Sequence, residues 1–379
     1  MIRELQERAR AVGSSVAAEL EGLEEREAAQ RALEAVASAG LVAYCVPERD
    51  GGARSGEYSS SDKVSVRLLC ALRDELAYHS GMLDVMLTMQ GLGSYPVVLG
   101  GSERLRQDVL PGVASGASIA AFALTEPNAG SSLTDVETGA ERVGEGWRLS
   151  GHKTFISNCG IARFYTVLAR TSGEPGSSGG LSMFFVPADL FGVECEPFEV
   201  MAPHPIGDVR FNDCELPPEF LLGEEGGGLG IALGTLSRFR TSVAAAANGF
   251  SRRALDESLG RLSSRIQFGK PLSANQALRF ELADMDARLR GAQLLVDEAA
   301  ELVDSDQDST LAVARAKLVA TEAAGWICDR AVQHFGGLGV KRGVMVERLY
   351  RDVRALRIYE GTSEIQKLII SKARLDSYR

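Results

Sequence analysis

The chain changes its residue pattern twice along its length, and this order restricts the folds open to it. From Met1 to about Ser115 it is rich in Ala, Leu, Glu and Arg at helical spacing. From about Ile119 to Gly223, short runs of β-favouring residues are separated by Gly, Pro, Asn and Asp. Long helical stretches return after Gly226. Because strands and helices do not alternate, the sequence disfavours a doubly wound sheet and predicts an α+β protein that is mainly α-helical.

Three domains follow from these changes of pattern. The first is helical. The second is expected to form a small antiparallel sheet or barrel, because its strands are short and are separated by turn residues. The third has long helical stretches joined by short breaks, which is typical of an antiparallel bundle, and the glycine-rich run at 226–230 is expected to be the turn that leads into it. The predicted domains span residues 1–117, 118–223 and 224–379.

The composition argues against several functional classes. The net charge is −10 and no run of basic residues stands out, so neither nucleic acid nor a membrane surface is an expected partner. No window approaches the ~18 consecutive apolar residues that a helix needs to span a bilayer. Residues 1–22 form an amphipathic pattern without the apolar stretch of a signal peptide, so we expect a cytoplasmic protein.

The cysteines and histidines show no recognisable ligand spacing. The 4 histidines form no HExxH-like pattern, so we expect no protein-built metal site. The 6 cysteines occur singly, without CxxC spacing and mostly among apolar neighbours, which predicts reduced thiols in the core. They are Cys45, Cys70, Cys159, Cys195, Cys214 and Cys328.

Near the end of the chain, Glu360 is a candidate general base. It follows the apolar-aromatic pair Ile358-Tyr359 and precedes a Gly-Thr-Ser turn. A carboxylate that is partly desolvated in such a position has a raised pKa and is a better proton acceptor near neutral pH. Taken alone, the segment also fits an ordinary helix start at Thr362, with Glu360 as a solvated residue before it.

Two segments of the β region contain residues suited to a flat or phosphorylated ligand. Residues 121–132 combine small residues, hydroxyls and a Pro-Asn-Gly kink, and clustered amides and hydroxyls of this kind can hold a polar ring edge or a pyrophosphate. The alternative is a plain loop that leads into a strand. In residues 151–158, Phe155 can stack on a flat cofactor, although core packing is the commoner role of a strand phenylalanine.

Two further segments lie where bundle helices should stop. In residues 265–271, Arg265 can bind phosphate bidentately, or it can simply interact with the partial negative charge at the C-terminus of its helix. In residues 333–339, three glycines permit close approach of a ligand to the backbone, or they cap the helix. The chain has no complete G-x-G-x-x-G, so any dinucleotide is expected to bind by a non-Rossmann route.

Taken together and in this order, the five segments resemble the acyl-CoA dehydrogenase flavoprotein family over essentially the whole chain. TEPNAGSS is similar to its first signature, HKTFISN to its flavin-stacking strand and RIQFG with Gln276 to its intersubunit phosphate clamp. QHFGG is similar to its adenine-side loop and IYEGTSEIQ to its catalytic segment. The resemblance implies an N-terminal helical domain, a middle β-barrel domain, a C-terminal four-helix bundle, bound FAD and a homotetramer built as a dimer of dimers.

The resemblance also implies roles for individual residues. Glu360 is the catalytic base, and Ser131, Arg240 and Gly361 contact the substrate. A first group of residues lies near the flavin, with the last two beside the base: Phe122, Leu124, Thr125, Ser131, Phe155, Ser157, Thr362 and Glu364. A second group binds the ADP half of an FAD in the neighbouring subunit: Arg265, Phe268, Gln276, Gln333, Gly336 and Gly337.

The implied reaction is α,β-desaturation of an acyl thioester. The base removes a proton α to the thioester carbonyl while hydride leaves the β carbon for flavin N5. The carbonyl is polarised by a flavin ribityl hydroxyl and by the backbone amide of the base, and an electron-transfer flavoprotein is the expected electron acceptor. Some members carry the base directly before the arginine that corresponds to Arg240. That residue is Phe239 here, which leaves Glu360 as the only carboxylate at either position.

Departures from the family pattern leave alternatives open. Ser132 stands where the first signature usually has Asp, which is expected to change local hydrogen bonding. Residues 236–240 lack the Asp that often contacts the pantetheine region, so the acyl carrier can be coenzyme A or an acyl carrier protein. The same fold also occurs in oxidases that return electrons to oxygen, and a non-catalytic flavin-binding scaffold is the third possibility.

Overall fold

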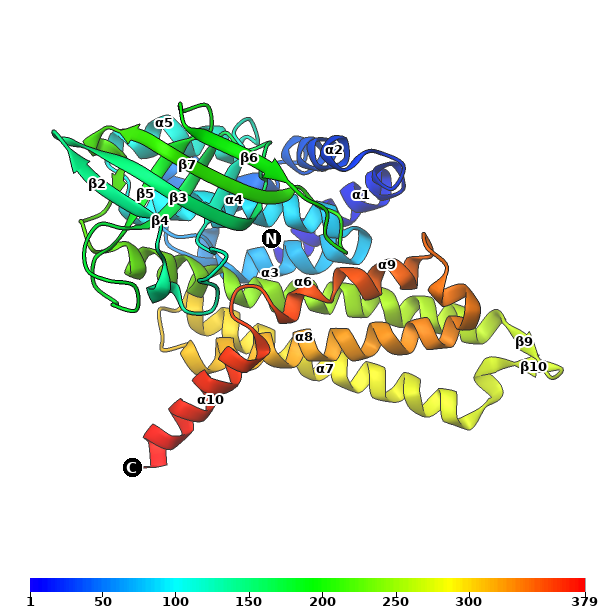
Figure 1. Ribbon diagram of the computed structural model, residues 1–379. Helices are drawn as coiled ribbons and strands as arrows, with labels where there is room; N and C mark the ends of the chain where they lie inside the picture. Colours follow the sequence, from blue (N-terminus) through cyan, green and yellow to red (C-terminus); the bar gives the residue numbers. More distant parts are fainter. Residues whose placement is uncertain (379) are drawn as a thin grey trace. The chain divides into compact units, whose positions relative to one another are not determined.

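The computed structural model describes residues 1–378, which form two compact units. The bundle unit comprises Met1–Ser14, Val66–Asp84 and the chain from Arg240 onward, and the sheet unit comprises Ser15–Ser65 and Val85–Phe239. The helices are α1 (Ile2–Leu20), α2 (Glu25–Ser38), α3 (Val66–His79), α4 (Gly81–Gly100), α5 (Glu103–Ala114), α6 (Gly228–Ser264), α7 (Gln276–Asp304), α8 (Thr310–Phe335), α9 (Met345–Asp352) and α10 (Ser363–Tyr378) (Figure 1).

The bundle unit is organised around the long helices α6, α7 and α8, which share one hydrophobic core. Small side chains dominate this core. On α6 the run from Val243 to Ala247 is buried, and α8 contributes Ala316, Ala320 and Ala324. Because alanine side chains are short, helix backbones can approach closely along such a surface. The helical bundle expected from the sequence is thus confirmed.

Helix α6 begins earlier than predicted. Of the predicted turn at 226–230, only Gly226 and Gly227 lie before the helix, so the prediction is wrong for residues 228–230. A Cβ atom at Gly228 would lie 2.3 Å from the backbone carbonyl carbon of Ser182. Glycine is therefore required there because the first turn of the helix packs directly on a strand of the sheet unit.

The sheet unit contains one eight-stranded sheet, in which strands pair in the order β6-β7-β3-β2-β4-β5-β8 and β1 pairs with β4. Most pairs are antiparallel as expected, but β1–β4 and β2–β4 are parallel. The strands are β1 (Ala120–Ala123), β2 (Gly139–Val143), β3 (Gly146–Ser157), β4 (Phe164–Arg170), β5 (Leu181–Pro187), β6 (Val193–Pro197), β7 (Ile206–Leu216) and β8 (Leu221–Leu222); β9 (Ile266–Gln267) and β10 (Lys270–Pro271) form a hairpin in the bundle unit.

Strand β4 is buried along its whole length and forms the centre of the sheet core. Residues on both of its faces are covered, which explains its continuous apolar run. A second part of this core is aromatic: the rings of Trp147 and Phe184 meet edge to face with their centroids 5.4 Å apart. The short β-favouring runs predicted from the sequence therefore supply the core strands.

Helix α4 is fixed to the sheet by polar contacts and by a close backbone approach. The side-chain oxygen of Gln90 accepts a hydrogen bond from the Ala120 amide (3.2 Å), and the Thr166 hydroxyl donates to the Gly93 carbonyl (3.0 Å). A Cβ atom at Gly93 would lie 2.6 Å from the Ala121 amide nitrogen. The helix can therefore lie against β1 only where it has no side chain.

All six cysteines are free thiols, and five are buried as expected. The exception is Cys195, which is exposed, so the expectation of a core thiol is wrong at this position. It lies on β6, whose last four residues are all exposed. In residues 1–378 no helix is long and apolar enough to cross a membrane, and no group of three or more His, Cys, Asp or Glu side chains is placed to hold a metal ion.

The substitution Gly93→Ala tests the contact between α4 and β1. We expect it to lower the apparent melting temperature, because overpacking against fixed backbone costs about 1–3 kcal/mol. Gly291→Ala is the matched control, since Gly291 also lies inside a helix but a Cβ atom there meets nothing within 4 Å. The control should be stabilised by roughly 0.5–1 kcal/mol. Thermal unfolding followed by far-ultraviolet circular dichroism measures both, and equal melting temperatures would contradict the proposed contact.

Candidate active site

Glu360 lies in a left-handed turn directly before α10. Its φ is 51° and that of Gly361 is 92°. The helix start suggested by the sequence is also present, because α10 begins at Ser363 and the Thr362 hydroxyl accepts a hydrogen bond from the Ile365 amide (3.3 Å). A non-glycine residue in this region of φ is strained by about 1–3 kcal/mol and persists only when its surroundings hold it.

Three side chains from three helices hold this turn through its carbonyl groups. Arg240 Nε on α6 donates to the Glu360 carbonyl (2.8 Å). Lys317 Nζ on α8 donates to the Gly361 carbonyl (2.7 Å), and Gln366 Nε2 on α10 donates to the same oxygen (3.0 Å). These contacts fix the backbone of the turn without occupying the Glu360 carboxylate.

The Glu360 carboxylate is shielded rather than solvated. Its Oε2 is inaccessible to water and has no hydrogen-bond partner among the described residues. Burial raises the pKa of Glu360, while the positive charges of Arg73, Arg240 and Lys317 oppose that rise. The group thus combines a raised proton affinity with an oxygen that is free to accept a proton, as a general base requires.

The three cations differ in how they are held. Arg73 is fully buried and makes two 2.8 Å contacts with Asp84 and one of 2.9 Å with the Ser242 hydroxyl. Lys317 is also buried, and burial lowers its pKa to about 8 although the nearby Glu360 charge opposes this. The sequence pattern did not single out either residue, because their positions near the base depend on packing between helices.

Phe239, at the second position considered for a base, packs in the core. Phe239 is fully buried, and its ring meets that of Tyr95 edge to face with centroids 5.6 Å apart. A Cβ atom at Gly91 would lie 2.2 Å from the Phe239 ring, so the ring fills the space beside α4.

Within residues 1–378, the backbone N–H of Glu360 makes no hydrogen bond and can serve as a donor.

In the sheet unit, the two predicted ligand segments lie side by side. The Thr154 amide donates to the Thr125 carbonyl (2.9 Å). The buried Lys153 ammonium donates to the Leu124 carbonyl (2.9 Å) and forms an ion pair with Glu126 (2.7 Å). Burial lowers the pKa of Lys153 to about 8 despite this pair. Burial also opposes ionisation of Glu126, but the Lys153 charge holds the pKa of that carboxyl below its ordinary value.

Phe155 does not pack in the core. It is 61% exposed at a φ of 55°, and its only ring partner among the described residues is Phe198, with centroids 5.2 Å apart. An exposed aromatic ring on strained backbone is suited to stacking on a flat ligand. Of the other predicted flavin contacts, Leu124 is buried, Ser131 is exposed, and the remaining three are half-buried: Phe122, Thr125 and Ser157.

The bundle unit brings together four of the six residues predicted to bind the ADP half of a cofactor. A hollow of about 460 Å³ is lined by Arg265, Gln333, Gly336 and Gly337, among others. Within the described residues the Arg265 guanidinium makes no hydrogen bond or ion pair. A Cβ atom at either glycine would meet nothing within 4 Å, so their backbone faces open space.

The other two predicted residues do not line this hollow. Phe268 lies at the turn of the β9–β10 hairpin, with a φ of 50° and a fully exposed ring. Gln276 begins α7 and is also exposed. Both are accessible to another molecule, and neither lines the hollow of this chain.

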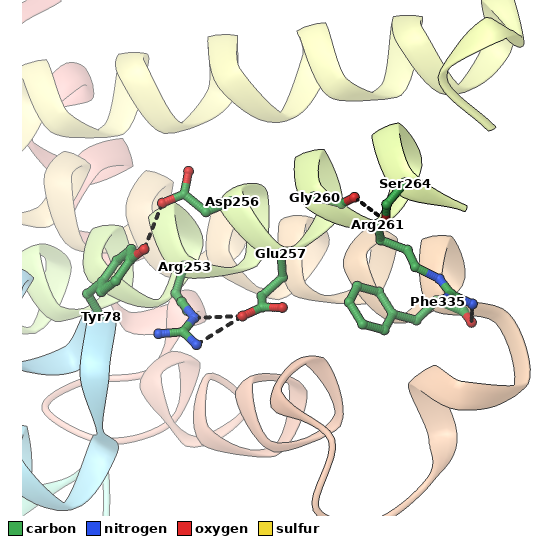
Figure 2. A pocket seen from close by; sticks show the side chains of 8 residues that line it. All are labelled: Tyr78, Arg253, Asp256, Glu257, Gly260, Arg261, Ser264 and Phe335. Atoms are coloured by element: carbon green, nitrogen blue, oxygen red, sulfur yellow. Dashed lines mark hydrogen bonds and ion pairs between the residues drawn. The ribbon is translucent and has the colours of Figure 1, made fainter. Parts of the chain in front are cut away.

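A second hollow, of about 510 Å³, shares Arg261 and Phe335 with the first and is shown in Figure 2. Its charged groups are mostly paired: the Tyr78 hydroxyl donates to Asp256 (2.8 Å), and Arg253 pairs with Glu257 (2.9 Å). Arg261 is only partly engaged: its Nη2 donates to the Phe335 carbonyl (3.5 Å), but its Nε has no hydrogen-bond partner among the described residues. It is therefore a further guanidinium beside Arg265 that the sequence analysis missed.

Each unit, taken by itself, has features that suit one part of an FAD molecule. The sheet unit offers an exposed aromatic ring with hydroxyl-bearing neighbours, as an isoalloxazine ring requires. The bundle unit offers the Arg265 guanidinium, the unpartnered Nε of Arg261 and open glycine backbone, which suit a pyrophosphate and an adenosine. The two predicted flavin contacts that follow Glu360 in the chain differ in exposure. Glu364 is exposed on the first turn of α10, and Thr362 is half-buried.

Comparison with known proteins identifies the family. Three family models match in succession: the N-terminal, middle and C-terminal domains of acyl-CoA dehydrogenase, over residues 2–117, 121–214 and 226–375. A probable acyl-CoA dehydrogenase of Mycobacterium tuberculosis is 34% identical over 350 residues, which are 91% of this chain and 87% of that protein.

Solved structures agree with this match. Butyryl-CoA dehydrogenase from Megasphaera elsdenii superposes with a TM-score of 0.90 at 31% identity, covering 99% of this chain and 98% of that one. A glutaryl-CoA dehydrogenase from Mycobacterium smegmatis in complex with FADH2 has a TM-score of 0.86 at 25% identity, with 98% and 94% covered. The chain therefore belongs to the acyl-CoA dehydrogenase family of FAD-dependent oxidoreductases that act on CH–CH groups.

Proposed function

We propose that the protein α,β-desaturates an acyl thioester and that Glu360 is its catalytic base. The observation that carries this proposal is the shielded Oε2 of Glu360, which lacks a partner in residues 1–378 and has three cations near it. A structural carboxylate in such surroundings would form an ion pair, because burying an unpaired charge is unfavourable. Here the cations instead contact backbone carbonyls or another acid.

The proton-transfer step follows from this geometry. The α C–H bond of the thioester breaks, and its proton passes to Oε2 of Glu360. The free N–H of Glu360 can donate to the thioester carbonyl, which stabilises the negative charge that develops there. When bound, FAD would supply the oxidising power as the acceptor of the hydride that leaves the β carbon. We assign Ser131, Arg240 and Gly361 to the substrate. Arg240 also holds the base, since its Nε donates to the Glu360 carbonyl.

We assign the cofactor contacts to two groups of residues. The residues assigned to the flavin ring are Phe122, Leu124, Thr125, Ser131, Phe155, Ser157, Thr362 and Glu364. The ADP half would be bound by Arg265, Phe268, Gln276, Gln333, Gly336 and Gly337 of a neighbouring copy. The exposure of Phe268 and Gln276 supports a role toward a second copy rather than within one chain.

The remaining parts of the proposal follow from the family. The acyl carrier is coenzyme A, with an acyl carrier protein as the alternative that the missing Asp in residues 236–240 leaves open. The electron acceptor is an electron-transfer flavoprotein. The protein assembles as a homotetramer, a dimer of dimers, as in the family. Sharing of the cofactor between subunits requires at least two of these copies. The protein acts in the cytoplasm.

The substitution Glu360→Gln tests the base. An amide cannot accept the proton, so anaerobic bleaching of the flavin by a reactive acyl thioester should slow by at least about 100-fold, since general-base catalysis contributes roughly 10²–10⁴. Glu298→Gln is the control, because it removes an exposed carboxylate on α7 and should leave the bleaching rate unchanged. Both variants should keep their FAD.

Three results would contradict this proposal or replace it with one of the alternatives. Unchanged bleaching in Glu360→Gln would remove Glu360 from the reaction. Peroxide released in air at the rate of turnover would identify an oxidase of the same fold. Wild-type protein that binds FAD but is bleached by neither coenzyme A nor carrier-protein thioesters of several acyl groups would identify a non-catalytic scaffold.

The substitution Arg265→Met tests the proposed phosphate contact. A hydrogen bond to a charged group contributes about 1.5–3 kcal/mol, so the dissociation constant for FAD should rise roughly 10- to 100-fold. Titration of apoprotein with FAD, followed by flavin fluorescence, measures this change. Arg290→Met removes an exposed arginine from α7 and should leave FAD affinity unchanged. An unchanged affinity in Arg265→Met would exclude this contact.

The substitution Lys317→Met tests how the cations tune the base. Lys317 opposes the rise in the pKa of Glu360, so its removal should raise that pKa further. The rate of flavin reduction requires ionised Glu360. As the pH is lowered, this rate should therefore begin to fall at a higher pH in the variant than in wild type. The two profiles should converge above about pH 8, where Lys317 itself loses its proton.

Lys367→Met is the control for this pH profile. Lys367 lies seven residues after the base but is exposed on α10, so solvent screens its charge. Its removal should not move the acid limb. Fully buried Lys317 tolerates methionine because the two side chains are similar in length and Gln366 still donates to the Gly361 carbonyl. An unshifted acid limb in Lys317→Met would show that this cation does not act on Glu360.

A further inference from the structure

The loop between β6 and β7 touches two of the residues that we assign to the flavin ring. The Phe198 amide donates to the Ile206 carbonyl (3.1 Å), which closes the loop. The Phe198 ring meets the exposed ring of Phe155 edge to face. Near the end of the loop, His204 Nε2 lies 3.3 Å from the Ser157 hydroxyl oxygen. One loop therefore supports both the aromatic and the hydroxyl side chain.

The backbone on each side of His204 is restricted. Pro203 and Pro205 flank it, and proline fixes its own φ while it pushes the preceding residue toward extended conformations. The Pro205 carbonyl accepts a hydrogen bond from the amide of Asn158 (2.7 Å), the residue after Ser157. The imidazole is thus held beside Ser157 by backbone contacts, independently of a ligand.

The hydrogen bonds of His204 have a defined direction. Its Nδ1 lies 3.0 Å from the Ala202 carbonyl, which can only accept, so Nδ1 carries the proton. Burial lowers the pKa of His204, although the bond to Ala202 opposes this, and the ring is therefore neutral near neutral pH. In a neutral imidazole the other nitrogen is an acceptor. Nε2 must then accept, and the Ser157 hydroxyl must donate to it.

We propose that His204 is a positioning residue that holds the proton of the Ser157 hydroxyl, so that Ser157 presents only acceptor lone pairs to bound FAD. The inference rests on the proposed contact between Ser157 and the flavin ring. Hydride uptake gives the ring an N–H donor where the oxidised ring has an acceptor nitrogen. A hydroxyl that accepts but does not donate therefore stabilises the reduced cofactor relative to the oxidised one and raises the reduction potential.

The test is the two-electron reduction potential of FAD in the holoprotein. In His204→Leu the hydroxyl is free to donate to the oxidised ring, so the ratio of reduced to oxidised cofactor at a fixed potential should fall at least tenfold, which is ~30 mV for two electrons. In a Ser157→Ala background, His204→Leu should cause no further change. His152→Leu is the control, because His152 Nε2 lies 3.0 Å from Asp208 and does not contact Ser157.

Separate results would overturn the inference and the proposed function. A potential in His204→Leu equal to that of wild type would overturn the inference, as would an equal shift in the presence and absence of the Ser157 hydroxyl. Both results leave flavin binding and bleaching by thioester intact. A wild-type protein that binds no FAD would instead contradict the proposed function itself, and the inference with it.

Discussion

The proposed chemistry depends on the left-handed turn at Glu360 and Gly361. The turn is strained, and it is held by donors from α6, α8 and α10 that all bind its carbonyl oxygens. The position of the carboxylate is therefore determined by how three helices pack, and two of them, α6 and α8, contribute to the alanine-rich core of the bundle unit. A small displacement of any of these helices would move the base.

Each unit buries a lysine near a carboxylate, and the different contacts indicate different roles. In the sheet unit, Lys153 pairs directly with Glu126, and that acid also accepts the amides of Glu137 and Thr138 (2.7 and 3.0 Å). Every oxygen of Glu126 is thereby occupied, which suits a structural brace. In the bundle unit, Lys317 binds a carbonyl and acts on Glu360 only through its field. The carboxylate remains free, as a reactive group must.

Sequence reasoning found what is encoded locally. The order of patterns predicted the helical and sheet regions. The apolar-aromatic pair before a Gly-Thr-Ser turn made Glu360 a candidate, and the family resemblance then favoured it over a solvated residue before a helix start. Sequence reasoning could not find Lys317 or Arg73, which lie 43 and 287 positions before the base and meet its surroundings only through helix packing. His204 gave a weak local signal, a histidine between two prolines, but its partner Ser157 lies 47 positions away. The positive φ of Phe155 has no signature in a sequence that lacks glycine there.

The β9–β10 hairpin carries the fully exposed ring of Phe268 on a backbone with φ of 50°. Such a ring adds little to the stability of an isolated chain, which agrees with the proposed role of the hairpin toward another copy. If the ADP half of each FAD is bound by the hairpin of another copy, cofactor binding and subunit association are linked by mass action. Dilution of the protein would then release flavin, and added FAD would in turn promote assembly.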